Sequence, residues 1–211
     1  MELLSRITPA ETLMLLKPTD SRMRDLMKFT VMDLILRQVL FVEHLQRKTV
    51  QGNRMIGYLY VFAGRNFRRE KPTLHEMVFL YPYYKRPRAK IIFHHLLQMA
   101  YSHAKNEEHF KRKYLLDSAP LRELIHIGFW QQVFGSFSLS EEGKKKRDEV
   151  ILYFNRLDSE LPDHINQKDD MAKALIRQIK GNVLLLNSIR FELLDLIGRE
   201  IAMVEGEVEA G

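Results

Sequence analysis

The sequence predicts a mainly α fold, a single compact helical domain with small β-hairpins. Apolar residues recur at spacings of three and four over most of the chain, which is the period of one face of an α-helix. Only short stretches change to the alternating period of a strand. The chain has 211 residues, of which 45% are hydrophobic, enough for one continuous core. We expect one domain over residues 1–204, followed by a disordered acidic tail over residues 205–211.

The first two predicted helices are separated by a proline. Residues 8–17 form a short helix that Pro18 closes. A longer helix spans residues 21–40, and Asp20 or Ser21 can cap it by accepting hydrogen bonds from its first amides. Its buried face consists of apolar residues at helical spacing: Met23, Leu26, Met27, Val31, Leu34 and Ile35.

A β-hairpin is predicted next, because the period changes from helical to alternating. Its first strand covers residues 39–48, its turn lies at residues 51–53, and its second strand carries Ile56, Tyr58, Tyr60 and Phe62 at alternate positions. Residues 64–70, which include Arg65, Arg68 and Arg69, are too polar for the core and predict an exposed connection.

The second half of the chain is predicted to be helical except for one further hairpin. Prolines and glycines set the expected boundaries. The expected elements are a helix over 74–81 ended by Pro82, a helix over 88–105, a helix over 120–127 ended by Gly128, a hairpin over 129–139, a helix from Ser140 through Arg156, a polar linker over 163–170, and two helical pieces within 171–204 divided at Gly181.

Charge is divided unevenly along the chain. Residues 20–115 contain 19 Lys or Arg against 8 Asp or Glu, a net charge of +11, whereas residues 148–211 contain 7 against 13, a net charge of −6. Clustered cations attract polyanions and displace their counterions. The basic part therefore predicts a polyanionic partner, either an anionic membrane surface or a nucleic acid.

Composition limits the compartment and the chemistry. There is no cysteine, so disulfides, thiol nucleophiles and cysteine zinc sites are excluded, in keeping with a reducing cytoplasm. Residues 1–10 include Glu2 and Arg6 and lack the apolar core of a signal peptide. No stretch reaches the roughly 20 apolar residues that span a bilayer. We expect a cytoplasmic protein that could lie on a membrane as a peripheral protein.

Signatures of catalysis are missing from the sequence. The chain contains no P-loop, no dinucleotide fingerprint and no G-x-S-x-G motif. The densest histidine group, His94, His95, His103 and His109, has no carboxylate at metal-ligand spacing. We therefore predict no enzyme activity, no catalytic residues, no metal and no cofactor.

Two basic clusters lie beside aromatic residues. Arg86 and Arg88 follow three tyrosines, and the run Lys111, Arg112 and Lys113 follows Phe110. Aromatic rings next to cations suit either contact with lipid headgroups or stacking on bases.

One resemblance favours nucleic acid. Residues 138–144 (SLSEEGK), after a predicted hairpin strand, resemble the strand-to-helix turn of bacterial winged-helix regulators. The helix that would read DNA is then residues 120–127, which offers only Arg122 and His126 for bases or phosphates. This alternative makes the protein a winged-helix nucleic-acid-binding regulator with winged-helix-like local units.

A second resemblance covers more of the chain. Residues 11–16 (ETLMLL), 31–43 (VMDLILRQVLFVE), 121–128 (LRELIHIG), 170–176 (DMAKALI) and 183–186 (VLLL) follow one another in an order similar to that of the Golgi phosphoprotein 3 family. The resemblance implies a cytosolic helical domain that binds an anionic phosphoinositide headgroup. The family's headgroup positions fall near Pro18, near Met27, and between His109 and Asp117.

The sequence therefore favours a non-enzymatic protein that binds an anionic surface such as a lipid headgroup. We predict that its binding face contains Arg24, Lys28, Lys111, Arg112 and Lys113, extended by Arg86 and Arg88. A third alternative is a homo-oligomeric scaffold in which the acidic part of one copy meets the basic part of another.

Overall fold

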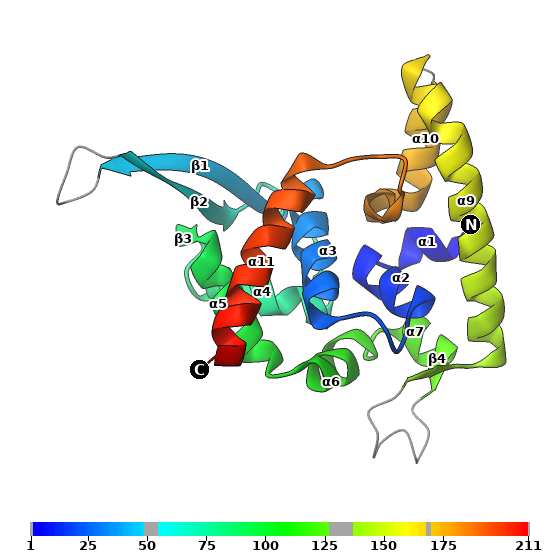
Figure 1. Ribbon diagram of the computed structural model, residues 1–211, viewed down its shortest axis with the longest axis horizontal. Helices are drawn as coiled ribbons and strands as arrows, with labels where there is room; N and C mark the ends of the chain where they lie inside the picture. Colours follow the sequence, from blue (N-terminus) through cyan, green and yellow to red (C-terminus); the bar gives the residue numbers. More distant parts are fainter. Residues whose placement is uncertain (1, 49–54, 127–136, 168–169, 211) are drawn as a thin grey trace.

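The computed structural model describes residues 2–48, 55–126, 137–167 and 170–210, and these confirm the mainly α fold class (Figure 1). The helices are α1 (Glu2–Arg6), α2 (Pro9–Leu16), α3 (Met23–Leu36), α4 (Leu74–Lys85), α5 (Phe93–Ala104), α6 (Glu107–Phe110), α7 (Ala119–Leu124), α9 (Glu141–Asn166), α10 (Asp170–Ile179) and α11 (Glu192–Ala210). A π-helix, η1 (Lys111–Leu115), follows α6, and a 3-10 helix, η2 (Lys180–Leu185), follows α10.

The largest sheet is a projecting hairpin. Strands β1 (Leu40–Lys48) and β2 (Met55–Ala63) pair antiparallel, with Leu40 opposite Ala63 at the base. A short third strand, β3 (Ile91–Ile92), pairs with the base of β2. Figure 1 shows this hairpin extending well beyond the helical body. The predicted hairpin is confirmed, and its turn at residues 51–53 lies outside the described residues.

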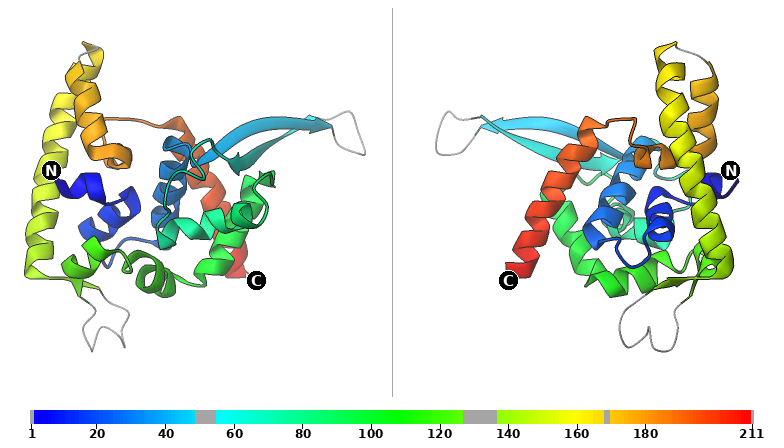
Figure 2. Two further views of the ribbon diagram at one scale, coloured as in Figure 1. Left: turned by 180° about the vertical axis from the view of Figure 1, so that it is seen from behind. Right: turned by 45° about the vertical axis from the view of Figure 1, so that its right-hand side comes forward.

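Helix α3 lies at the centre of the helical body, with α2, α4 and α11 packed around it (Figures 1 and 2). One continuous cluster of buried apolar side chains extends from Leu4 to Val204. Asn182 fastens the N-terminal segment to η2, because its buried amide donates hydrogen bonds to the carbonyls of Leu4 and Ile7. In the described part of the chain, no helix combines the length and the apolar composition needed to cross a bilayer.

Local sequence signals account for the first helices. Thr8 accepts a hydrogen bond from the Glu11 amide while the Glu11 carboxylate accepts one from the Thr8 amide, a reciprocal cap that starts α2. The same arrangement at Thr73 and Glu76 starts α4. The predicted helix over residues 21–40 is confirmed as α3, which begins at Met23 and ends at Leu36.

Two helices continue beyond their predicted ends, and each contains a proline. Helix α4 continues past Pro82 to Lys85. Helix α9 contains Pro162 and continues past its predicted end at Arg156 to Asn166, through the first half of the predicted polar linker. A proline inside a helix costs a hydrogen bond and some strain, but buried side chains nearby, Tyr83 after Pro82 and Leu161 beside Pro162, hold each helix against the core.

Other boundaries also differ from the sequence prediction. Residues 91–92 join the sheet instead of the helix predicted over 88–105, and α7 ends at Leu124, where β4 (Ile125–His126) begins. Strand β4 pairs antiparallel with β5 (Ser138–Leu139), and most of the hairpin predicted over 129–139 lies outside the described residues. The sequence predicts a disordered tail from residue 205, whereas α11 continues to Ala210, with Val204 buried and Glu205 bound to Arg24.

Candidate anion-binding surface

Arg24 and Lys28 lie one turn apart on α3, and each faces a carboxylate of the same chain. The Arg24 guanidinium lies 3.6 Å from the Glu205 carboxylate of α11, and the Lys28 ammonium lies 3.6 Å from Asp25. Helix α11 packs directly against this part of α3. Much of the charge of these two predicted site residues is therefore balanced within the molecule.

The run Lys111 to Lys113 divides among three environments. Lys111 is buried, with its side chain 2% exposed, and its ammonium donates to Glu107 at 2.9 Å and to the Thr19 carbonyl at 3.4 Å. Arg112 is paired with Glu108 at 3.0 Å. Lys113 is exposed and lies over the Tyr114 ring. Within this run, Lys113 alone offers an exposed cation without a described carboxylate partner.

Lys111 has a structural role that its sequence does not reveal. The other oxygen of its partner Glu107 accepts a hydrogen bond from the Met23 amide, at the start of α3. Lys111 and Glu107 thus connect η1 and α6 to the segment between α2 and α3. A buried charge that is satisfied in this way stabilises the fold and cannot reach a partner without breaking the pair.

Arg86 and Arg88 occupy the connection between α4 and β3, where the structure leaves them exposed. Lys85 and Lys90 lie on either side of them and are also exposed. Lys85 lies over the Tyr81 ring at 4.6 Å, and Lys90 lies over the Tyr60 ring at 4.3 Å. These contacts orient the cations without neutralising them, since a ring carries no net charge.

A second exposed basic segment joins this one in space. Arg65, Arg68, Arg69 and Lys71 lie between β2 and α4, and Phe67 of this segment contacts Tyr84 of α4 with ring centroids 4.8 Å apart. The contact brings together segments that are about 17 residues apart in sequence. We call the combined surface the cationic patch; its members are Arg65, Arg68, Arg69, Lys71, Lys85, Arg86, Arg88 and Lys90.

The acidic residues within the same stretch do not neutralise the cationic patch. Residues 64–90 contain only two, Glu70 and Glu76, and both bind Arg37 at the end of α3. Arg37 also donates to Asp33 at 2.9 Å. Burial lowers the pKa of the Arg37 guanidinium, but Asp33, Glu76 and Glu70 together raise it above its ordinary value. Within the described ranges, neither carboxylate is paired with a member of the cationic patch.

The structure therefore places the predicted site residues in several environments. Arg86 and Arg88 belong to the cationic patch, whereas Arg24, Lys28, Lys111 and Arg112 are engaged by carboxylates of the chain itself. The sequence predicts residues 64–70 only as an exposed connection. Three arginines within five residues, close to a run of tyrosines, is the sequence signal that indicates them.

The winged-helix alternative depends on α7, β4 and β5. Arg122 on α7 donates to the Asp117 carboxylate at 2.9 Å, so its guanidinium is partly engaged, and His126 is exposed. Ser140 caps α9 by accepting from the Gly143 amide, as the turn at residues 138–144 predicts. This local unit therefore has the expected helix start but few free cations.

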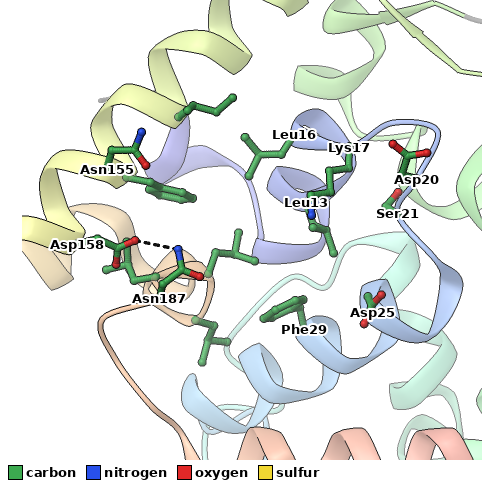
Figure 3. Close-up of a pocket in the computed structure, with 15 residues that line it drawn as sticks. Leu13, Leu16, Lys17, Asp20, Ser21, Asp25, Phe29, Asn155, Asp158 and Asn187 are labelled. Atoms are coloured by element: carbon green, nitrogen blue, oxygen red, sulfur yellow. Dashed lines mark hydrogen bonds between the residues drawn. The ribbon is translucent and has the colours of Figure 1, made fainter.

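A different type of cavity lies between α2, α3, α9 and the segment after η2 (Figure 3). It has a volume of about 500 Å³ and an apolar floor that includes Leu13, Leu16 and Phe29. Its rim carries Asp20, Asp25 and Asp158 against the single cation Lys17. Asp158 accepts hydrogen bonds from Asn187 and from the Ser188 amide, which hold its pKa below the ordinary value although burial opposes them. The rim is unsuited to an anion.

In the described ranges, no group of three or more His, Asp or Glu side chains is arranged to hold a metal ion.

Comparison with known proteins gives no match: no family model, no curated protein and no solved structure matches the chain. The resemblance to the Golgi phosphoprotein 3 family stays a prediction.

Proposed function

We propose that this protein binds the surface of an anionic membrane reversibly, as a peripheral protein, through the cationic patch. The observation that carries the proposal is the contact between Phe67 and Tyr84, which joins two chain segments that together carry eight exposed cations. Each cation near an anionic bilayer contributes about 1 kcal/mol. Several together are sufficient for salt-sensitive, reversible docking.

Two exposed tyrosines beside the cationic patch favour a membrane over a soluble polyanion as its partner. Tyr81 and Tyr84 are 41% and 47% exposed beside Lys85 and Arg86. Tyrosine is enriched where a protein meets the boundary between lipid headgroups and acyl chains, because its ring is apolar and its hydroxyl is polar. The proposal is a binding role and assigns no chemical reaction.

Co-sedimentation with vesicles tests the proposal. We expect pelleting with vesicles that contain phosphatidylserine or a phosphoinositide, little pelleting with phosphatidylcholine alone, and a steep loss of binding as salt rises. A variant in which Arg68, Arg69, Arg86 and Arg88 are all changed to Ala should bind at least about 100-fold more weakly, since each cation contributes about fivefold.

A matched control removes the same charge elsewhere. Residues 144–147 of α9 (KKKR) carry four cations, of which Lys144, Lys146 and Arg147 are paired with neighbouring carboxylates. Changing all four to Ala should leave vesicle binding nearly unchanged. If both variants lose the same amount of vesicle affinity, the binding depends only on net charge and the proposal is overturned.

The same proteins distinguish nucleic acid from membrane. If the cationic patch binds membranes, duplex DNA at physiological salt should compete poorly for vesicle-bound protein. Specific retardation of DNA, with vesicle binding absent, would replace this proposal with the nucleic-acid alternative.

A further inference from the structure

An apolar cavity lies at the base of the hairpin, next to the cationic patch. It has a volume of about 590 Å³ and is lined by residues from the end of α3, the start of β1 and the end of β2. Its lining is mostly apolar and includes Ile35, Phe41 and Val42, and Arg65 is the single charged residue in that lining. Its volume is within the roughly 300–1,000 Å³ typical of ligand pockets.

The cavity opens beside side chains that are exposed although they are apolar. Phe41 lines it and is 54% exposed, and Leu36, which follows the lining residue Ile35, is also exposed. Phe41 packs against Phe62 with ring centroids 6.2 Å apart, and Phe62 in turn lies under the ammonium of Lys90, a member of the cationic patch. Exposed apolar surface that continues into a binding surface indicates a contact with an apolar partner.

The walls of this cavity are held in place by the backbone. Gly64 lies so close to the end of α3 that a Cβ atom there would be 2.2 Å from the Gln38 carbonyl oxygen. Gln38 has a positive φ of 58°, and its carbonyl also accepts a hydrogen bond from the Asn66 amide. The turn that carries Arg65 is therefore fixed against the hairpin base, and Arg65 keeps its place at the rim.

Charge decides which amphiphile fits this cavity. A ligand with an apolar chain and an anionic head would place the chain against lining residues such as Phe41 and Val42, and the head near Arg65 and the rest of the cationic patch. The cavity of Figure 3 has three carboxylates on its rim and disfavours the same ligand.

We infer that the cavity at the hairpin base takes up an acyl chain of the anionic phospholipid whose headgroup the cationic patch binds. This inference rests on the proposed function and adds to it a hydrophobic contact with one lipid molecule. It predicts that part of the binding depends on acyl-chain length and resists salt, because removing apolar surface from water depends little on ionic screening.

Soluble short-chain lipids separate the electrostatic contribution of the headgroup from the hydrophobic contribution of the acyl chain. We expect dioctanoyl phosphatidylserine, kept below its micelle concentration, to bind at least about tenfold more tightly than the dibutanoyl lipid. Complete burial would give about fourfold per methylene, and an open cavity buries a chain only in part. The difference should persist at high salt, while both affinities fall.

Variants at the cavity distinguish it from the cationic patch. Phe41→Ser should reduce the affinity for the dioctanoyl lipid to near that for the dibutanoyl lipid, and Phe41→Leu should retain most of the preference. Leu152→Ser, at a 71% exposed position on α9, is the matched control and should change neither affinity. Circular dichroism of each variant verifies that the fold is kept.

The outcomes for the two proposals differ. If both lipids bind wild-type protein equally while vesicle binding remains salt-sensitive, the acyl-chain inference is overturned and the proposed function stands. If neither lipid nor anionic vesicles bind, both are overturned. If Phe41→Ser leaves the preference for the longer acyl chain intact, the acyl chain binds at another surface and the inference is also overturned.

Discussion

Protonation of the buried carboxyl of Asp33 affects the free energy of unfolding. Its carboxylate lies at the end of α3 beside Arg37, and one of its oxygens has no hydrogen-bond partner within the described structure. Burial raises the pKa of Asp33 to about 6 from an ordinary value of 3.8, and Arg37 only partly opposes the shift. The folded protein therefore binds this proton more tightly than the unfolded chain does.

The sign of the pH dependence follows from that shift. Because the pKa is raised in the folded state, the contribution of Asp33 is fully present below about pH 4 and is lost as pH rises through about 6. It amounts to at most about 3 kcal/mol. We expect wild-type protein to gain stability, relative to Asp33→Asn, when urea unfolding is moved from about pH 7.5 to about pH 5. Parallel pH profiles of the two proteins would contradict this assignment.

Gly64 offers a second test at the residue scale, and one that concerns the hairpin base. A Cβ atom would collide with backbone, which cannot rotate away as a side chain can. We expect Gly64→Ala to lower the free energy of unfolding by about 2 kcal/mol. Gly206→Ala, on α11 where an added Cβ would meet nothing beyond the helix's own backbone within 4 Å, should change it little or raise it by up to about 1 kcal/mol. Chemical denaturation measures both changes.

Helix α11 has an apolar face that packs against the core and acidic side chains that pair with basic residues. Its Ile197, Ile201 and Val204 are buried against α3 and α5, while Glu205 pairs with Arg24, and Glu200 and Glu207 lie beside His94. Surface ion pairs of this kind contribute less than about 1 kcal/mol each. The apolar face therefore provides most of the attachment, and the carboxylates select which basic surface it covers.

That division of roles predicts unequal effects along α11. Ile201→Ala should lower the free energy of unfolding by about 2–4 kcal/mol, because it leaves a cavity in the core. Met203→Ala, at a position that is 51% exposed, should change it by about 0.5 kcal/mol or less. Thermal or urea unfolding measures both, and similar losses would indicate that α11 is not packed as described.

Sequence patterns were sufficient for elements whose signals are local. Helical periodicity predicts α3, Pro18 predicts the end of α2, and alternation predicts the hairpin. Pro82 misled the prediction of where α4 ends, because tertiary packing outweighs a local helix breaker. The site was harder to predict: burial of Lys111 and the joining of residues 65–71 to 85–90 depend on contacts with Thr19 and between Phe67 and Tyr84, distant in sequence.

In the whole molecule, part of the acidic charge of the C-terminal region is paired with basic residues of the same chain. The acidic C-terminal helix lies on α3 and α5, two helices of the basic part, and engages Arg24 and His94 there. The cationic patch lies in other segments, and its eight cations are left uncovered. The carboxylates that a charge-driven oligomer would use are therefore partly occupied within one chain.

This arrangement predicts how the protein responds to salt. Raising ionic strength from about 0.1 M to about 1 M shortens the Debye length from about 10 Å to about 3 Å. We expect the molecular mass in solution, measured by light scattering, to stay constant over this range, because α11 is attached mainly by apolar contacts within its own chain. Binding to anionic vesicles should fall steeply over the same range, because the cationic patch is exposed. A mass that decreases as salt rises would instead support the oligomeric scaffold, in which α11 of one copy reaches the cationic patch of another.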